Sequence, residues 1–370
     1  MQQFEFATSA RIVFGAGSLR TLRDVGKRVM LVTGRSHRVA LELEEVCRFA
    51  IDGEPTVEQV SAGAALAREL GCDTVISVGG GSAIDGGKAI AALATNAGDP
   101  LEYLEVIGKG RPLKAAPLPF IAVPTTAGTG SEVTHNAVLA ARKQKVKVSL
   151  RSPLMIAKLA VVDPELTVGL PSEITAYTGL DALTQVIEPY VSIRANALTD
   201  LFCLEGMLRV RPSLARAYEN GDDLDARTDM SYASLLGGLS LANAGLGVVH
   251  GFAGPIGGMF DAPHGAVCAA LLPHGVDVNI RALRARGQSV ERFQAAARVL
   301  TGRPQAAADD AAVWLHGLCE MLGVKPLRSY GIGPEHVAEL IEKAEKSSSM
   351  KGNPCVLSRG ELEEVIGPAI

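Results

Sequence analysis

The sequence has no apolar run long enough to cross a membrane, and its N-terminus has no apolar core typical of a signal peptide. The most apolar stretches, residues 120–123 and 266–272, are far shorter than the roughly 20 residues of a membrane span. No run of like charge appears, and 36 Lys and Arg nearly balance 40 Asp and Glu. That balance argues against a nucleic-acid-binding protein or an acidic tail. We expect a soluble, cytoplasmic chain with neither nucleic acid nor a membrane as partner.

Cysteines and aromatic residues are also few. The six cysteines are scattered and none forms a CxxC pair, so we interpret them as reduced thiols rather than a disulfide framework. Aromatic residues make up only 4% of the chain, whereas there are 40 glycines. This balance favours an Ala/Gly/Leu-rich α/β enzyme over a β-sandwich. A chain of 370 residues exceeds the usual range of a single core, which predicts two domains with a ligand cleft between them.

The two halves of the chain differ in hydrophobic periodicity. The first half alternates short β-branched runs with a helical stretch at residues 57–70; the runs are residues 29–33, 74–78, 121–123 and 160–162. Continuous apolar strands separated by helices predict a parallel sheet buried on both faces. From about residue 170 only helical patterns follow, at residues 174–192, 196–218, 226–244, 264–272, 290–300 and, as a pair of short helices, 334–366. The fold class is therefore α/β plus all-α: a parallel-sheet nucleotide-binding domain at 1–165 and a helical bundle at 166–370.

The strongest local signal is the segment GGGSAIDGGK, which begins at Gly79 directly after a predicted strand. Glycines there let the backbone approach a charged ligand, and a helix beginning near Ser82 adds its positive end, a suitable seat for a pyrophosphate. The segment matches neither the Rossmann GxGxxG nor the P-loop pattern. The alternative is a tight strand-to-helix turn without a ligand. A second glycine pair, Gly15 and Gly17, is interpreted as a turn.

A second loop, PTTAGTGSE from Pro124, also follows a predicted strand. Its small hydroxyl residues can donate to phosphate and ribose oxygens. Two such loops at successive strand ends place a dinucleotide along the carboxyl edge of a parallel sheet.

The helical half carries a candidate metal site. Asp181 and Gln185 lie one helical turn apart and share a face. His250 and His264 lie further along, and His264 follows a proline at the start of a new helix. An Asp with histidines could bind Fe(II) or Zn(II) and leave a position for substrate. The alternative is that these histidines are packed or surface residues.

Six motifs together resemble the iron-containing alcohol dehydrogenase family. They are GGGSAIDGGKA, PTTAGTGSEVT, DPELTVGLP, TGLDALTQVIEPYVS, HGFAGPIGGMFDAPHGAVCAALLPH and SSSMKGNP, in the family's order. The resemblance covers nearly the whole chain. It implies a dinucleotide-binding domain, a helical domain, a homodimer and NAD(P)-linked interconversion of alcohols with aldehydes or ketones, at a divalent metal in the interdomain cleft.

Residue by residue, the resemblance implies cofactor contacts at Gly80, Gly81, Ser82, Asp85, Thr125, Thr126, Thr129, Asn136 and Lys147. The family's metal ligands, an Asp and three His, fall on Asp181, Gln185, His250 and His264. Gln185 stands where the family has His, and an amide oxygen is a weak donor beside imidazole. The site could therefore bind its metal weakly, with an extra water, or not at all.

Two further departures concern the proton relay and the coenzyme. Gly254 stands where many members carry a relay His. After the first strand, Gly34 stands where the family often has an acidic residue that accepts a hydrogen bond from the ribose 2′-hydroxyl. Arg35 and Ser36 could hold a 2′-phosphate there. The sequence thus favours NADP(H), with NAD(H) as the alternative; Arg35 could instead point into solvent.

Three other functions stay open. They are a metal-independent reductase similar to the maleylacetate reductase branch, a lyase similar to dehydroquinate synthase, and a non-catalytic NAD(P)-binding protein. The lyase would need a Lys- and Arg-rich anion pocket, and the helices around Asp181 and His250 carry few such residues. No pattern in the sequence identifies the substrate.

Overall fold

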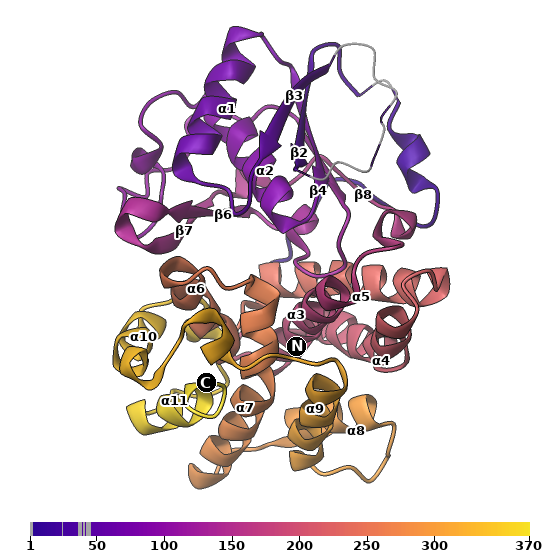
Figure 1. The fold of residues 1–370 in the computed structure, drawn as a ribbon, viewed down its shortest axis with the longest axis vertical. Coiled ribbons are helices and arrows are strands. Elements are labelled where there is room, and N and C mark those ends of the chain that lie inside the picture. The colour runs from indigo at the N-terminus through magenta and orange to yellow at the C-terminus, as the bar shows by residue number, and fades with distance from the viewer. Residues whose placement is uncertain (1–2, 24, 36–38, 40, 42–45) are drawn as a thin grey trace. The chain divides into compact units, whose positions relative to one another are not determined.

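The computed structural model describes residues 3–23, 25–35, 39, 41 and 46–370. The chain divides into two compact units. One is Ala7–Val168, and the other is Gly169–Ile370 together with the N-terminal segment up to Phe6. The boundary expected between residues 165 and 166 stays a prediction. Figure 1 labels the elements of both units, which are described separately.

The first unit is built on a six-stranded sheet in which every neighbouring pair is parallel. In spatial order the strands are β1 (Ile12–Phe14), β8 (Leu159–Val162), β5 (Phe120–Pro124), β4 (Thr74–Gly79), β2 (Val29–Gly34) and β3 (Val46–Ile51). The central strands β2, β4 and β5 are apolar and buried, as parallel strands covered on both faces require. The predicted parallel sheet is confirmed.

Two helices pack on one face of this sheet, and Figure 1 shows both beside it. They are α1 (Val57–Glu69), which begins at a capping box formed by Thr56 and Gln59, and α2 (Gly81–Thr95). An antiparallel hairpin of β6 (Asn136–Ala141) and β7 (Val146–Arg151) joins the same core. The opposite face is covered by the segment around the short 3₁₀ helix Ser18–Thr21.

The order of the sheet sets the position of the cofactor loops. Strands β5, β4 and β2 are adjacent, and the chain reverses its direction of winding between β2 and β4. Their carboxyl ends therefore lie side by side at the reversal point, where open α/β sheets bind nucleotides. The segments that follow β2, β4 and β5 begin at Arg35, Gly80 and Thr125.

The second unit is helical. Its helices are α3 (Ser172–Val191), α4 (Ala197–Glu219), α5 (Leu224–Ala244), α6 (Val248–Met259), α7 (His264–Ala285), α8 (Glu291–Thr301), α9 (Asp309–Met321), α10 (Val337–Glu345) and α11 (Arg359–Ile366). Helices α3, α4 and α5 pack against one another, and α7 packs against α3, α6, α9 and α11. The predicted change from sheet to helices near residue 170 is confirmed.

Several elements were absent from the sequence prediction: β1, β3, the β6–β7 hairpin, α6 and α9. Helix α6 contains Pro255 and several glycines, which lower helix propensity, and tertiary packing outweighs this effect. Among the described residues, no single helix has the length and apolar character of a membrane span; α5 and α6, bent by 97° at their junction, meet that test only as a pair.

Candidate functional site

The first predicted loop forms the start of helix α2. Gly80 occupies the N-cap position with extended backbone, and it makes no side-chain cap to the first N–H groups. These N–H groups are the positive end of the helix, and an anion such as a pyrophosphate would pair with them. The predicted glycine loop thus has the geometry of an anion cradle.

The two predicted loops of the first unit meet each other. A Cβ atom at Gly81 would lie 2.6 Å from Cγ2 of Thr129, and one at Gly80 would lie 3.4 Å from the Oγ1 atom of Thr126. The backbone N–H of Thr125 donates to the Gly79 carbonyl at 2.9 Å. Glycine is therefore required at position 81 by close approach, and the hydroxyls of both threonines lie beside the α2 N-terminus.

Asp85 belongs to a buried charged cluster below this loop. Its Oδ2 atom accepts a hydrogen bond from the Val138 N–H at 2.9 Å, and its Oδ1 atom lies 3.8 Å from Nζ of Lys88. Lys88 is fully buried and donates to the Ser131 carbonyl, the Thr134 hydroxyl and the Asn136 carbonyl. Asp85 and Lys88 therefore tie α2 to the second loop and to β6.

The same cluster perturbs its ionisable groups. Burial lowers the pKa of the Lys88 ammonium to about 8, and burial raises the pKa of the Glu132 carboxyl to about 7. For both groups, burial therefore disfavours the charged form relative to the same group in water.

The remaining predicted cofactor residues have different surroundings. Lys147 is nearly buried, and its Nζ lies 3.1 Å from Oε1 of Glu54. Arg35 is exposed and forms an ion pair with Asp52, which follows β3. Ser36 lies outside the described residues.

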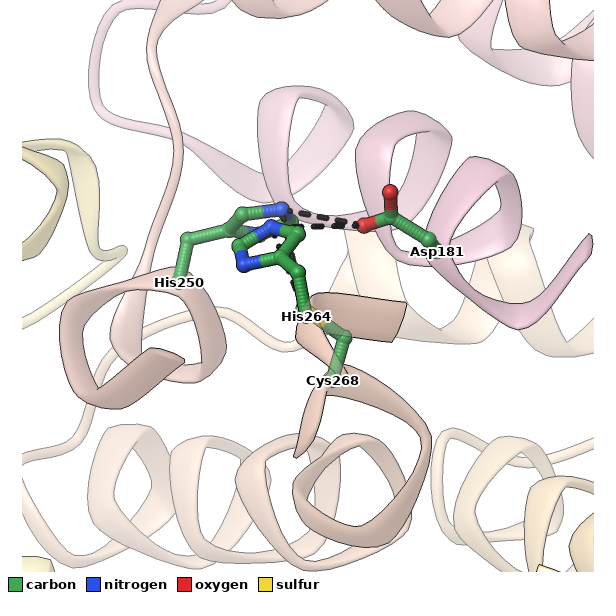
Figure 2. Close-up of side chains that lie close together, drawn as sticks. All are labelled: Asp181, His250, His264 and Cys268. Carbon is green, nitrogen blue, oxygen red and sulfur yellow. Dashed lines mark hydrogen bonds and ion pairs between the residues drawn. The ribbon is translucent and has the colours of Figure 1, made fainter. Parts of the chain in front are cut away.

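In the helical unit, three of the four predicted metal residues converge. The Nε2 atom of His250 lies 3.3 Å from Oδ1 of Asp181, and Nε2 of His264 lies 3.8 Å from the same oxygen. The Sγ atom of Cys268 lies 3.8 Å from Nε2 of His250 and 3.7 Å from Nε2 of His264. One ligand atom from each of these four residues lies within 4.8 Å of every other. Figure 2 shows the four side chains turned toward one another.

Close helix packing brings the start of α7 to α3. A Cβ atom at Gly265 would lie 2.4 Å from the carbonyl oxygen of Tyr177, closer than any real side chain allows. Because residue 265 is glycine, the first turn of α7 can contact α3, and His264 can reach Asp181. The glycine of the PHG segment is thus explained by packing.

Glu188 orients His250. Its Oε2 atom lies 2.7 Å from Nδ1 of His250, and its Oε1 accepts the Val249 N–H at 2.7 Å. A carboxylate holds no proton to donate, so Nδ1 of His250 is the donor and Nε2 faces Asp181. A carboxylate behind the imidazole is the usual partner of a metal-binding histidine.

The electrostatics of the cluster favour added positive charge. Burial alone would lower the pKa of His250, but Cys268, Asp181 and Glu188 outweigh it and raise the pKa. Burial alone would raise the pKa of Asp181 and of Cys268, yet the imidazoles lower both. The Oδ1 atom of Asp181 is buried and accepts no hydrogen bond. A carboxylate, two imidazoles and such an oxygen fit a divalent cation.

Gln185 and Gly254 are the two departures from the family pattern. Gln185 is buried one turn after Asp181, and its Oε1 atom has no hydrogen-bond partner. A Cβ atom at Gly237 of α5 would lie 3.1 Å from Cβ and 3.5 Å from Oε1 of Gln185, so the Gln185 side chain packs against α5 at this glycine. Gly254 lies in α6, and nothing stands within 4 Å of where its Cβ would be.

Sequence reasoning missed Cys268 and Glu188. A signal was present for each: Cys268 follows His264 by one helical turn, and Glu188 follows Asp181 by two turns on the same helix. All six cysteines lie in the described part of the chain and are free thiols.

The chain matches two sequence models of known families. One is described as "Iron-containing alcohol dehydrogenase" and matches residues 9–164; the other is "Fe-containing alcohol dehydrogenase family, C-terminal" and matches residues 175–370.

Individual relatives agree with these matches. Alcohol dehydrogenase 4 of Saccharomyces cerevisiae is 35% identical and aligns with 96% of both chains. The 1,3-propanediol dehydrogenase of Citrobacter freundii is 33% identical over 93% of this chain and 92% of its own. Among solved structures, an alcohol dehydrogenase from Oenococcus oeni superposes with a TM-score of 0.91 at 30% identity, covering 100% of both chains. The chain therefore belongs to the iron-containing alcohol dehydrogenase family.

Proposed function

We propose that the protein is an NAD(P)-dependent oxidoreductase that interconverts an alcohol with an aldehyde or ketone at a divalent cation, Fe(II) or Zn(II). The observation that carries this proposal is the convergence of Asp181, His250 and His264 on one point, with the Asp181 Oδ1 atom left without a donor. In the proposal these three side chains hold the cation, with Gln185 beside it. Such a cation, when bound, supplies a Lewis acid for the substrate oxygen, and the nicotinamide supplies or accepts the hydride.

In this proposal, side chains of the helical unit bind the cation and orient one another for that purpose. Glu188 keeps Nδ1 of His250 protonated, so that Nε2 presents a lone pair. The side chain of Asp181 adds negative charge in a buried position, which strengthens the attraction for a cation. Gly265 keeps the first turn of α7 close enough for His264 to complete the set.

The first unit binds the dinucleotide in this proposal. Gly80, Gly81 and Ser82 present N–H groups at the start of α2 to the pyrophosphate. Thr125, Thr126 and Thr129 add hydroxyl groups from the neighbouring loop. Asp85, held by the Val138 N–H and Lys88, acts by positioning that loop.

We further infer that Arg35 decides between the coenzymes and favours NADP(H). A guanidinium at the end of β2 can pair with a 2′-phosphate, which NAD(H) lacks. Asp52 favours NAD(H) instead, because its carboxylate already forms an ion pair with Arg35 and would repel a 2′-phosphate. Asn136 and Lys147 stay predictions as cofactor contacts, and so does the homodimer. Six free thiols are consistent with a cytoplasmic, reducing setting.

The test is a spectrophotometric screen of alcohols and aldehydes with NAD(H) and NADP(H), with added Fe(II), Zn(II) or a chelator. We expect turnover that depends on the cation. Turnover that is unchanged when no cation is detectable would instead favour a metal-independent reductase. A rise in melting temperature with NADPH but no turnover on any substrate would favour a non-catalytic binder.

A further inference from the structure

We propose that Cys268 is the fourth protein ligand of this cation, in place of the family's third histidine, and that its thiolate makes the site select Zn(II) over Fe(II). This inference rests on the proposed function, because it concerns the same cation. It adds a ligand that the sequence pattern of the family does not include and a metal preference that follows from it.

Four of the six separations among the ligand atoms are close to those of tetrahedral coordination, and all six are within 4.8 Å. Zinc lies about 2.3 Å from a thiolate and about 2.0–2.2 Å from an imidazole or carboxylate, so tetrahedral neighbours are about 3.3–3.5 Å apart for nitrogen and oxygen and about 3.5–3.7 Å apart where one is sulfur. The sulfur of Cys268 lies 3.8 Å and 3.7 Å from the Nε2 atoms of His250 and His264. The Asp181 oxygen lies 3.3 Å and 3.8 Å from the same two nitrogens. The observed separations lie at this spacing or a few tenths of an ångström above it.

The position of Cys268 on α7 explains how it reaches the site. Cys268 follows His264 by one helical turn, so both side chains project from the same face of α7. Its side chain is buried, and the sulfur lies near both imidazole nitrogens. A packed apolar cysteine would be surrounded by carbon, as most buried thiols are.

Gln185 is the competing fourth ligand, and its donor chemistry argues against it. Its amide oxygen is buried without a hydrogen-bond partner, but a neutral amide is a weaker donor to a divalent cation than a thiolate, and the side chain packs against α5 at Gly237. The chain thus carries a replacement on a different helix for the histidine absent from position 185.

A thiolate changes which cation is preferred. Sulfur is a soft donor that suits Zn(II), whereas imidazole and carboxylate ligands serve several divalent metals alike. When the cation binds, the thiol proton of Cys268 passes to solvent and the sulfur bonds to the metal as thiolate. The resulting ligands, one Asp, two His and one Cys, differ from the one Asp and three His that the family resemblance implies.

The test uses Co(II), whose spectrum reports its ligands, in the full-length protein after metal removal. We expect stoichiometric Co(II) to give an intense near-ultraviolet thiolate-to-cobalt charge-transfer band. Cys268→Ser and Cys268→Ala should lose the band and bind Zn(II) on the order of 100-fold more weakly, at the upper end of the loss expected when a supporting residue is removed. Cys319→Ser, a buried thiol elsewhere on α9, and Gln185→Ala should keep the band.

The outcomes separate this inference from the proposed function. Bound Co(II) without a thiolate band, or a band that survives both Cys268 variants, would overturn the role of Cys268 and leave a metal-dependent dehydrogenase intact. Failure of the wild-type protein to bind any divalent cation, with turnover retained, would overturn both. The wild-type spectrum decides the sulfur contact even if a variant folds poorly.

Discussion

The Nδ1 atom of His250 lies 2.7 Å from the Oε2 atom of Glu188. Both side chains are buried, and the contact turns Nε2 of His250 toward Asp181. The orientation of one imidazole is thus set by a carboxylate that lies two turns along α3 from Asp181. In the proposed metal site, α3 therefore supplies both a ligand, Asp181, and the carboxylate that supports another ligand, His250.

Glu188→Gln should therefore weaken cation binding by about 10–100-fold while leaving the fold intact, because an amide orients the imidazole without its negative charge. The dissociation constant for Zn(II), measured by competition with a chelator, checks this. Glu173→Gln is a matched control on the same helix, because Glu173 is exposed and pairs only with Lys325 and Tyr177. Equal affinity in wild type and Glu188→Gln would show that Glu188 is structural only.

Asp181→Ala and His264→Ala should each abolish both bound metal and turnover, since each removes one of the proposed ligands. Metal content by elemental analysis and the rate of NAD(P)H formation should fall together. His316→Ala serves as the control because His316 is exposed on α9. Retained turnover in a metal-free Asp181→Ala protein would contradict the metal-centred reaction.

Gly265→Ala should separate α7 from α3 and reduce stability by on the order of 1–3 kcal/mol, because the added methyl group meets the Tyr177 carbonyl oxygen. Cation affinity should fall with it, as His264 moves away from Asp181. Gly317→Ala is the matched control: Gly317 lies on the exposed side of α9, its Cβ would meet nothing within 4 Å, and we expect a gain of about 0.5–1 kcal/mol. Thermal melting of the two variants gives the comparison.

The coenzyme preference should respond to two charges at the strand ends. Arg35→Ala should lower kcat/KM for NADP(H) by about 10-fold relative to NAD(H), and Asp52→Asn should raise it, since the freed guanidinium can pair with the 2′-phosphate. Arg23→Ala, an exposed arginine of the same unit, is the control. If neither substitution changed the preference between NADP(H) and NAD(H), the ribose 2′-position of the coenzyme would not lie beside Arg35.

Stability should depend on pH through Glu132. Burial raises the pKa of its carboxyl from 4.5 to about 7, so between these values the folded protein binds more protons than the unfolded chain. The free energy of unfolding therefore falls as pH rises through this window. Relative to Glu132→Gln, wild type should lose on the order of 2 kcal/mol between about pH 5 and about pH 7. Denaturant titrations at both pH values test this, with exposed Glu58→Gln following wild type.

The sequence predicted the parts of the fold that have strong local patterns. Apolar strands such as 74–78 and long amphipathic helices were recognisable, whereas β3 and α6 depend on tertiary contacts that override their local preference. At the site, Asp181, His250 and His264 were found from the motifs. Cys268 was missed although it follows His264 by one helical turn, because that spacing alone does not show that both side chains face Asp181 and His250.

The metal centre is tested most directly by removing the cation and restoring it. Chelated protein, freed of chelator, should be inactive, and turnover should rise linearly with added Zn(II) or Fe(II) until one cation is bound per chain, with Asp181→Ala unresponsive throughout. Full turnover in wild-type protein shown to contain no cation would contradict the account.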